Sequence, residues 1–330
     1  MNKSYKSKIT LIFRELSEKY GYEFHLMAHD IDAGYILANG VIHYFSYGTV
    51  DLNNSSAIEF AQNKVLSSKI VEKVGICLPH ESVIKFSKDL AVDIKCAVEF
   101  VGLPAIIKPV HGAQGKNIFK IESIEEIYFI CNKNTFDKDD LIVQEYIDVL
   151  NEIRIVLLDG EVIQAYKRDY AHLIGDGIKT IQKLIEDKNN YFKNKNRNTR
   201  IDIHDSQIQN ILKNKIFDLT SVLPFGNRLN LSYGRNLSKG GDYEFVENML
   251  SQNLIDISKQ IAKSTGLRLV GLDLFLSDKV EYIKNKNQVT FIEYNASPDM
   301  ENNFYYDGDY DEILKKIYEK VFLAIVSRTS

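Results

Sequence analysis

The chain has 330 residues, of which 45% are hydrophobic and 26% are charged, so it is long enough for two or three compact units with their own cores. The formal net charge is -4 and no long basic run broken by aromatics occurs, which gives no reason to expect nucleic acid as a partner. The start of the chain lacks the apolar core of a signal peptide and no apolar run of membrane-spanning length occurs, so we expect a cytoplasmic protein without a membrane span.

The first segments predict a small N-terminal α/β cap. Residues 5–20 have apolar side chains at helical spacing, namely Ile9, Ile12, Phe13 and Leu16. Gly21 is placed to end that helix. Between residues 22 and 50, short apolar runs are broken by turn residues, and Asn39-Gly40 is a strong hairpin signal. We expect no catalytic residue in this cap.

Two helices are predicted next, one over residues 57–74 that stops at Gly75 and one over residues 87–100. Lys64 lies in the first of them and, taken alone, would be a surface lysine. The three cysteines are far apart and form neither a Cys-x-x-Cys motif nor a Cys/His cluster, so we expect no disulfide framework or structural zinc: Cys77, Cys96 and Cys131.

A strand over residues 103–109 ends in Lys108-Pro109 and leads into a loop that contains Gly112 and Gly115. Glycines let backbone N–H groups approach an anion, and Lys108 would supply a positive charge beside them. The pattern is not a Walker motif, because it lacks that spacing and no helix follows at once. A plain hairpin is the alternative interpretation. Lys116 is expected to face solvent.

Residues 141–147 predict a strand with a polar exit, and a second hairpin follows over residues 154–166, turned at Asp159-Gly160. Arg154 alternates along its strand and could be a plain ion-pair partner. After Arg168, Thr180 can cap a further helix. We expect a mobile loop over residues 189–206, little regular structure over residues 221–242, and helices over residues 243–265 and 311–326.

Two short aliphatic and aromatic stretches predict strands, residues 270–276 and 291–298. Alternation would place Phe291, Glu293 and Asn295 on one face. Asp273 lies between leucines, where a lone carboxylate is costly to desolvate. If the strands pair, Asp273 can join Glu293 and Asn295 around a hard cation such as Mg²⁺. A buried Asp273 satisfied by an arginine, with Glu293 on a solvated face, is the alternative, and these two segments alone leave both open.

Taken together and in this order, these pieces resemble the ATP-grasp carboxylate–amine ligases. The ordered set is Lys64, Ile107-Lys108-Pro109, the Gly112/Gly115 loop, Gln144-Glu145-Tyr146-Ile147, Glu152-x-Arg154, Gly271-Leu272-Asp273 and Glu293-Tyr294-Asn295-Ala296-Ser297-Pro298. Two further elements make it resemble the ligase part of cyanophycin synthetases and bifunctional glutathione synthetases, with ribosomal-protein glutamate ligases as a broader relative: residues 168–177 and Asn236-x-Ser238-x-Gly240-Gly241. The resemblance runs from Asn63 onward.

This resemblance implies an α+β protein of the ATP-grasp fold, in which two α/β subdomains grip ATP between antiparallel sheets. The expected division is an N-terminal cap (1–60), a linker with helices (61–101), a small lid subdomain (102–150) and a large C-terminal subdomain with the metal site (151–330). It also implies an enzyme that joins an amino-acid or peptide carboxylate to an amine through an acyl phosphate, with ATP cleaved to ADP and phosphate. By analogy we expect a homo-oligomer.

The resemblance also implies a role for each candidate residue. The nucleotide phosphates would be contacted by Lys64, Lys108 and the lid loop that contains Gly112 and Gly115. The adenine hinge comprises Gln144, Glu145, Tyr146 and Ile147, and Glu152 would accept bonds from the ribose hydroxyls. The ligands of Mg²⁺, or of Mn²⁺ in its place, are Asp273, Glu293 and Asn295. The charged oxygens of the intermediate would be stabilised by Arg168, Arg154 and Asn236.

One departure from the family pattern lies after the candidate metal site. Related ligases continue into Pro-Gly, whereas here Pro298 is followed by Asp299 and an acidic, aromatic run. We expect Asp299, Tyr305, Tyr306 and Asp307 to shape a pocket for a cationic amine or a peptide, with an acidic surface loop as the alternative. Two other functions stay open, a ligase that forms amides or esters on a ribosomal peptide precursor and a non-catalytic ATP-binding regulatory protein.

Overall fold

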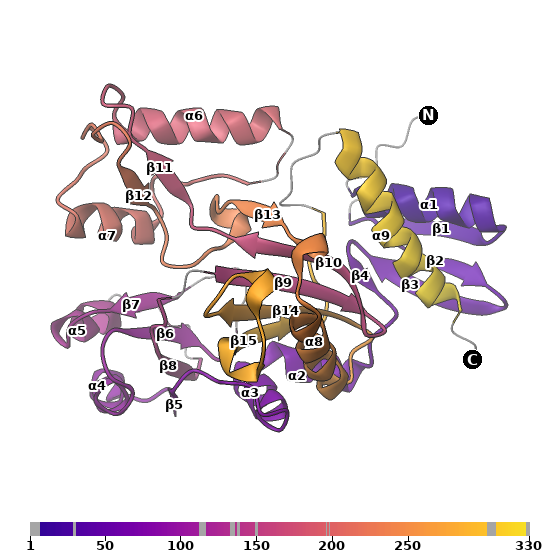
Figure 1. The fold of residues 1–330 in the computed structure, drawn as a ribbon, viewed down its shortest axis with the longest axis horizontal. Helices are drawn as coiled ribbons and strands as arrows, with labels where there is room; N and C mark the ends of the chain where they lie inside the picture. Colours follow the sequence, from indigo (N-terminus) through magenta and orange to yellow (C-terminus); the bar gives the residue numbers. More distant parts are fainter. Residues whose placement is uncertain are drawn as a thin grey trace.

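The computed structural model describes residues 7–28, 31–111, 117–132, 136, 139–148, 151–195, 197, 199–301 and 308–327. Some predicted positions lie outside these residues: Gly112, Gly115, Lys116, Tyr305, Tyr306 and Asp307. Across the described residues the strands form four sheets, and none of the helices there combines the length and the apolar character needed to span a bilayer. The largest sheet lies at the centre of Figure 1.

The N-terminal unit comprises residues 7–28 and 31–54. It holds α1 (Lys8–Tyr20) and a meander of β1 (Glu23–Ala28), β2 (Ala33–Ala38), β3 (Val41–Ser46) and β4 (Thr49–Val50). The predicted helix end is confirmed, since Gly21 has a left-handed φ of 75°, and Asn39-Gly40 joins β2 to β3. The closing helix α9 (Gly308–Val326) packs on α1 in one shared core, where Phe13 contacts Tyr318 (Figure 1).

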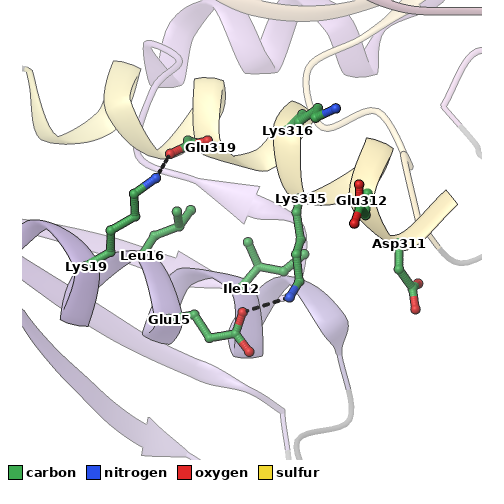
Figure 2. A pocket seen from close by; sticks show the side chains of 9 residues that line it. All are labelled: Ile12, Glu15, Leu16, Lys19, Asp311, Glu312, Lys315, Lys316 and Glu319. Carbon is green, nitrogen blue, oxygen red and sulfur yellow. Dashed lines mark hydrogen bonds and ion pairs between the residues drawn. The ribbon is translucent and has the colours of Figure 1, made fainter. Parts of the chain in front are cut away.

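A groove of about 410 Å³ runs between α1 and α9 (Figure 2). Ion pairs cross it from Lys19 to Glu319 at 2.6 Å and from Lys315 to Glu15 at 3.1 Å. Such exposed pairs contribute little to stability. None of the residues that line this groove belongs to the candidate site described below, so the groove is a structural seam between the first and last helices.

The single helix expected over residues 57–74 is wrong, because Asn63 divides it into α2 (Ser55–Gln62) and α3 (Lys64–Glu72). The backbone of Asn63 is extended, its side chain accepts from the N–H groups of Val65 and Leu66, and it forms a β-bridge with His111. Asparagine competes for local backbone groups in this way and so favours caps over helix interiors. The break places Lys64 in the first turn of α3.

The small sheet has the order β5-β8-β6-β7 and is antiparallel throughout. Its strands are β5 (Glu81–Ile84), β6 (Ala105–Pro109), β7 (Phe119–Ile121) and β8 (Leu141–Glu145), and its helices are α4 (Leu90–Val101) and α5 (Glu125–Asn132). Ile107 and Val143 join the core beneath these helices. Because side chains alternate along a strand, Lys108 and Gln144 lie on the opposite face.

The central sheet has the order β13-β10-β9-β14-β15. Its strands are β9 (Asn151–Leu158), β10 (Glu161–Arg168), β13 (Tyr243–Phe245), β14 (Leu269–Leu276) and β15 (Val289–Asn295). One face, with Ile155 and Leu272, packs in a core with α8 (Gln252–Thr265) and α3. The helix expected from residue 243 begins only at Gln252, because β13 precedes it and Ser251 caps it.

A β-bulge in β15 overturns part of the predicted face. The register passes from Asp273 opposite Glu293 to Leu274 opposite Phe291, so Ile292 is an extra residue. Phe291 therefore turns into the α8 core, where it is 1% exposed and its ring centroid lies 6.1 Å from that of Tyr294. Strict alternation would have placed it beside Glu293.

The remaining elements form an insertion between β10 and β13, at the upper left of Figure 1. They are β11 (His172–Ile174), α6 (Ile181–Asn194), α7 (Ser206–Asn214) and β12 (Arg228–Asn230). Short 3-10 turns occur at η1 (Leu237–Lys239), η2 (Glu247–Met249), η3 (Val280–Tyr282) and η4 (Lys286–Gln288). The mobile loop expected over residues 189–206 is wrong for much of its length, since α6 covers its start and the Arg197 side chain is buried.

Candidate active site

The open face of the central sheet carries a row of charged side chains. Register places Arg154 of β9 opposite Asp273 of β14, and Asp273 opposite Glu293 of β15. One step along, Arg168 of β10 lies opposite Glu152. The alternation that buries Ile153 and Ile155 on the α8 side thus gathers charge from four strands on this side.

Asp273 is the centre of this row and is only 2% exposed. Arg154 donates to both of its oxygens, from Nε at 2.5 Å and from Nη2 at 2.6 Å, and Arg168 Nη1 donates to Oδ2 at 3.1 Å. Burial would raise the pKa of Asp273, but the two guanidinium groups outweigh burial and hold that pKa below its ordinary value. The arginine-satisfied interpretation of Asp273 is therefore present in the structure, and it leaves about one of four acceptor positions unused.

The donor chemistry beside Asp273 also suits a hard cation. Glu293 adds a second carboxylate, and among the residues that the structure describes the buried Asn295 Nδ2 has no hydrogen-bond partner. Because amide oxygen and nitrogen can exchange places by a flip, the same side chain can present its oxygen. Within the described ranges, no group of three His, Cys, Asp or Glu side chains is placed to hold a metal ion. A cation here would need the amide together with water or phosphate oxygens, as Mg²⁺ commonly has.

The small sheet contributes a buried cation to the same space. Lys108 is 7% exposed and its Nζ donates to Gln144 Oε1 at 2.9 Å, while Gln144 Nε2 donates to Glu81 at 2.7 Å. Burial is the largest influence on Lys108 and lowers its pKa, Lys64 lowers it further, and the carboxylates of Glu293 and Glu81 raise it. Lys64 and Glu293 act on Lys108 because the structure brings them near it. Three predicted residues from α3, β6 and β15 therefore share one electrostatic environment.

The predicted adenine hinge has part of its backbone already paired. The N–H of Glu145 donates to His80 O at 2.9 Å, and that of Tyr146 donates to Pro104 O at 3.0 Å. Ile147, by contrast, makes no hydrogen bond with the described residues. The Gln144 side chain is committed to Lys108. Within the described part of the chain, Ile147 is thus the hinge residue whose N–H has no hydrogen-bond partner.

Glu152 lies between two arginines, one of which the sequence reasoning missed. Its carboxylate is 3.2 Å from Arg168 Nη1 and 3.7 Å from Arg235 Nη1, and burial raises its pKa. Arg235 is buried and lies 4.5 Å from the ring centroid of Tyr170. Burial and a hydrogen bond with Tyr146 raise the pKa of Tyr170. The signal that could have found Arg235 is its place directly before Asn236, the first residue of the Asn236-x-Ser238-x-Gly240-Gly241 motif.

Asn236 has a clear structural role. Its Oδ1 caps η1 and accepts from Ser238 N at 3.0 Å and from Ser238 Oγ at 2.8 Å. The buried Arg197 donates to the carbonyls of Leu237 and Gly241 and so holds the same segment in place. These contacts position Arg235 beside Glu152.

Gly271 faces this site and leaves room for Pro298. A Cβ on Gly271 would lie 2.8 Å from Pro298 Cβ, so we expect Gly271→Ala to destabilise the protein by about 1–3 kcal/mol through overpacking. Denaturant unfolding measures this, with Gly234→Ala as the control because a Cβ there meets none of the described residues within 4 Å. Equal stability of the two variants would contradict the tight contact.

Comparisons with known proteins show which proteins this chain is similar to. Residues 61–172 match the family described as the RimK-like ATP-grasp domain. The cyanophycin synthetase of Trichormus variabilis is 30% identical over 272 residues, which cover 79% of this chain and 29% of that protein. The bifunctional glutathione biosynthesis protein of Streptococcus agalactiae serotype V is 26% identical over 297 residues, 86% of this chain and 38% of that protein. The chain thus spans well under half the length of these relatives.

Solved structures show the same fold. A bifunctional glutathione synthetase from Pasteurella multocida superposes with a TM-score of 0.58 over 95% of this chain and 44% of that chain, at 17% identity. A D-alanine–D-alanine ligase from Bacillus anthracis does so with a TM-score of 0.50 over 83% of this chain and 71% of that chain, at 15% identity. The α+β ATP-grasp fold predicted from the sequence is confirmed.

Proposed function

We propose that this chain, which has the ATP-grasp fold and carries a RimK-like ATP-grasp domain, is an ATP-dependent carboxylate–amine ligase. It joins an amino-acid or peptide carboxylate to an amine in the cytoplasm, where free cysteines such as Cys77 stay reduced. The observation that carries the proposal is the buried cluster of Asp273, Arg154 and Arg168 on the central sheet, together with the buried Lys108 of the small sheet, whose pKa the Glu293 carboxylate raises. Opposed cations and carboxylates between two sheets suit a polyphosphate and its metal ion.

The triphosphate lies between the sheets in this account. Lys108 and Lys64 would contact its oxygens, while Asp273, Glu293 and Asn295 would hold Mg²⁺, or Mn²⁺ in its place. When bound, the ion would neutralise negative charge on the phosphates. Gln144 orients Lys108 through the 2.9 Å bond to its ammonium, so that the cation keeps its position without a phosphate. The adenine reaches the Ile147 N–H, and Glu152 lies where a ribose hydroxyl can replace an arginine as its partner.

The reaction transfers the γ-phosphoryl group to an oxygen of the substrate carboxylate, which releases ADP. The amine then attacks the acyl carbon, loses a proton and displaces phosphate, leaving an amide. Arg168 is suited to the charged oxygens of the acyl phosphate because its buried guanidinium lies between Glu152 and Asp273, at 3.2 and 3.1 Å, on the charged face of the central sheet. Arg235 is placed across Glu152 to assist, whereas Arg154 is engaged by Asp273 and Asn236 by η1.

Release of ADP in the presence of pooled amino acids and peptides tests this function. We expect Mg²⁺-dependent ADP formation that rises with at least one pool, because the acceptor completes the turnover. AMP in place of ADP would overturn the acyl-phosphate route. If ATP and Mg²⁺ bind but no pool stimulates ADP release, the chain is instead a regulatory ATP-binding protein.

A further inference from the structure

Asn53 lies at the end of the N-terminal unit. Its side chain makes four hydrogen bonds with the backbone at the ends of two strands of the candidate site. Its Nδ2 donates to Leu269 O and to Ala296 O, both at 2.8 Å. Its Oδ1 accepts from Arg268 N at 2.8 Å and from Leu269 N at 3.0 Å. An asparagine side chain offers two donor hydrogens and two acceptor lone pairs, so none is left over.

These four bonds join the start of β14 to the exit of β15. β14 carries Asp273, and Ala296 directly follows Asn295 in the chain. The amide of Asn53 therefore sets where the backbone leaves Asn295 relative to the strand that presents Asp273. Losing it would leave four backbone groups to find water or to shift.

A second contact holds the chain five residues further on. Glu301 accepts from Lys8 N at 2.6 Å, Ile9 N at 3.4 Å and Ser7 Oγ at 3.2 Å, so its carboxylate caps the N-terminal end of α1. We name residues 296–301 the anchored segment. Pro298 packs on Gly271 within it, and Met300 is 1% exposed in the core shared by α1 and α9.

We propose that Asn53 is a positioning residue for the cation site, and that the N-terminal unit serves the ligase by holding the anchored segment. Asn53 touches neither nucleotide nor metal in this account. It acts through Ala296 on the orientation of Asn295 and through Leu269 on β14. The inference rests on the proposed function, because it assumes that Asn295, Asp273 and Glu293 share a cation.

The test is the affinity of the full chain for ATP, measured by calorimetry with and without Mg²⁺, together with direct Mn²⁺ binding followed by electron paramagnetic resonance. Asn53→Ala is expected to weaken Mn²⁺ binding and the Mg²⁺-dependent part of ATP affinity by about 10–100-fold, as loss of residues that orient metal ligands typically does. The affinity for ATP without Mg²⁺ is expected to stay within about twofold, because the lysines are untouched.

Asn39→Ala is the matched control. Asn39 lies in the same unit, at a left-handed turn with φ of 52°, and donates to Val326 O at 3.3 Å, so its loss weakens the unit without touching the anchored segment. We expect it to lower the melting temperature and to leave metal dependence unchanged. Asn53→Asp keeps the acceptor oxygen, loses the donor bonds and sets a carboxylate oxygen against the carbonyls of Leu269 and Ala296, which provides a second variant that acts on the donor bonds if Asn53→Ala does not fold.

The outcomes separate the two proposals. Suppose that the wild type binds ATP in an Mg²⁺-dependent way. If Asn53→Ala or Asn53→Asp then binds Mn²⁺ and Mg²⁺–ATP as tightly as the wild type, the positioning role is overturned and the proposed function stands. An equal loss of metal dependence in Asn39→Ala would overturn it as well, since the effect would then be general loosening of the unit. If the wild type itself shows no Mg²⁺-dependent ATP affinity, the proposed function fails first.

Discussion

Replacing Glu293 with glutamine is expected to lower Mg²⁺-dependent ADP formation at least about a hundredfold. The reason is that a carboxylate holding the cation contributes several kcal/mol to a transition state of high negative charge, and about 1.4 kcal/mol corresponds to a factor of ten in rate. The change also removes a negative charge that raises the pKa of Lys108, so the charged form of this buried lysine becomes less favourable. Steady-state ADP release across a range of Mg²⁺ concentrations measures the effect.

Glu244→Gln is the control for this substitution. Glu244 pairs with Lys167 at 3.6 Å on β13, with its side chain 63% exposed, so losing its charge should leave ADP release within about twofold of wild type. Glutamine matches the shape of glutamate, and denaturant unfolding of Glu293→Gln should remain close to wild type. Full activity in Glu293→Gln would refute the site.

The second large effect concerns stability. Asp273→Asn is expected to lower the free energy of unfolding by about 3–5 kcal/mol, because Arg154 and Arg168 would be left as uncompensated buried charges. Asp159→Asn is a matched control, since Arg268 forms the same bidentate pair with Asp159, at 2.7 and 2.8 Å, but near the surface. It should cost less than about 1 kcal/mol.

The dependence on pH has a definite sign. The folded pKa of Asp273 lies below its ordinary value of 3.8, so its ionised form contributes stability that is present above that value and is lost as pH falls through the folded pKa. The difference between wild type and Asp273→Asn should therefore shrink below pH 3.8. A difference that grew in acid would contradict the ion-pair account.

Combining Asp273→Asn with Arg154→Leu sharpens the test. The double variant also removes the Arg154 guanidinium, which Asp273→Asn leaves as a buried charge without its carboxylate. It should therefore regain part of the stability that Asp273→Asn loses. Strictly additive losses would show that Arg154 and Asp273 do not act as a pair.

Much of the candidate site was predictable from local pattern. Alternation along two short strands predicted that Asp273 and Glu293 could share a site if the strands paired, and the structure pairs them opposite each other. The lysine that ends an apolar strand drew attention to Lys108, with a plain hairpin as the alternative. The order of the motifs then carried the fold. These features are short-range or depend on order along the chain, which a sequence states directly.

The rest depended on contacts between distant segments. The bulge at Ile292 follows from how β15 pairs with β14, and the helix break at Asn63 follows from a bridge to His111. Neither partner is visible from local periodicity. From the sequence, Arg235 is indistinguishable from an exposed loop arginine, whereas the structure buries it beside Glu152. Asn53 likewise has the sequence context of a turn residue, and only the fold brings Ala296 to it.

In the proposed reaction the substrate carboxylate takes the γ-phosphoryl group of ATP. Once a pool that stimulates ADP release is identified, its acids can be labelled with ¹⁸O in their carboxylates. The account predicts that the phosphate released carries one ¹⁸O, because the oxygen that attacks phosphorus leaves with it when the amine forms the amide. Phosphate without ¹⁸O, released at the same rate as amide, would contradict the account.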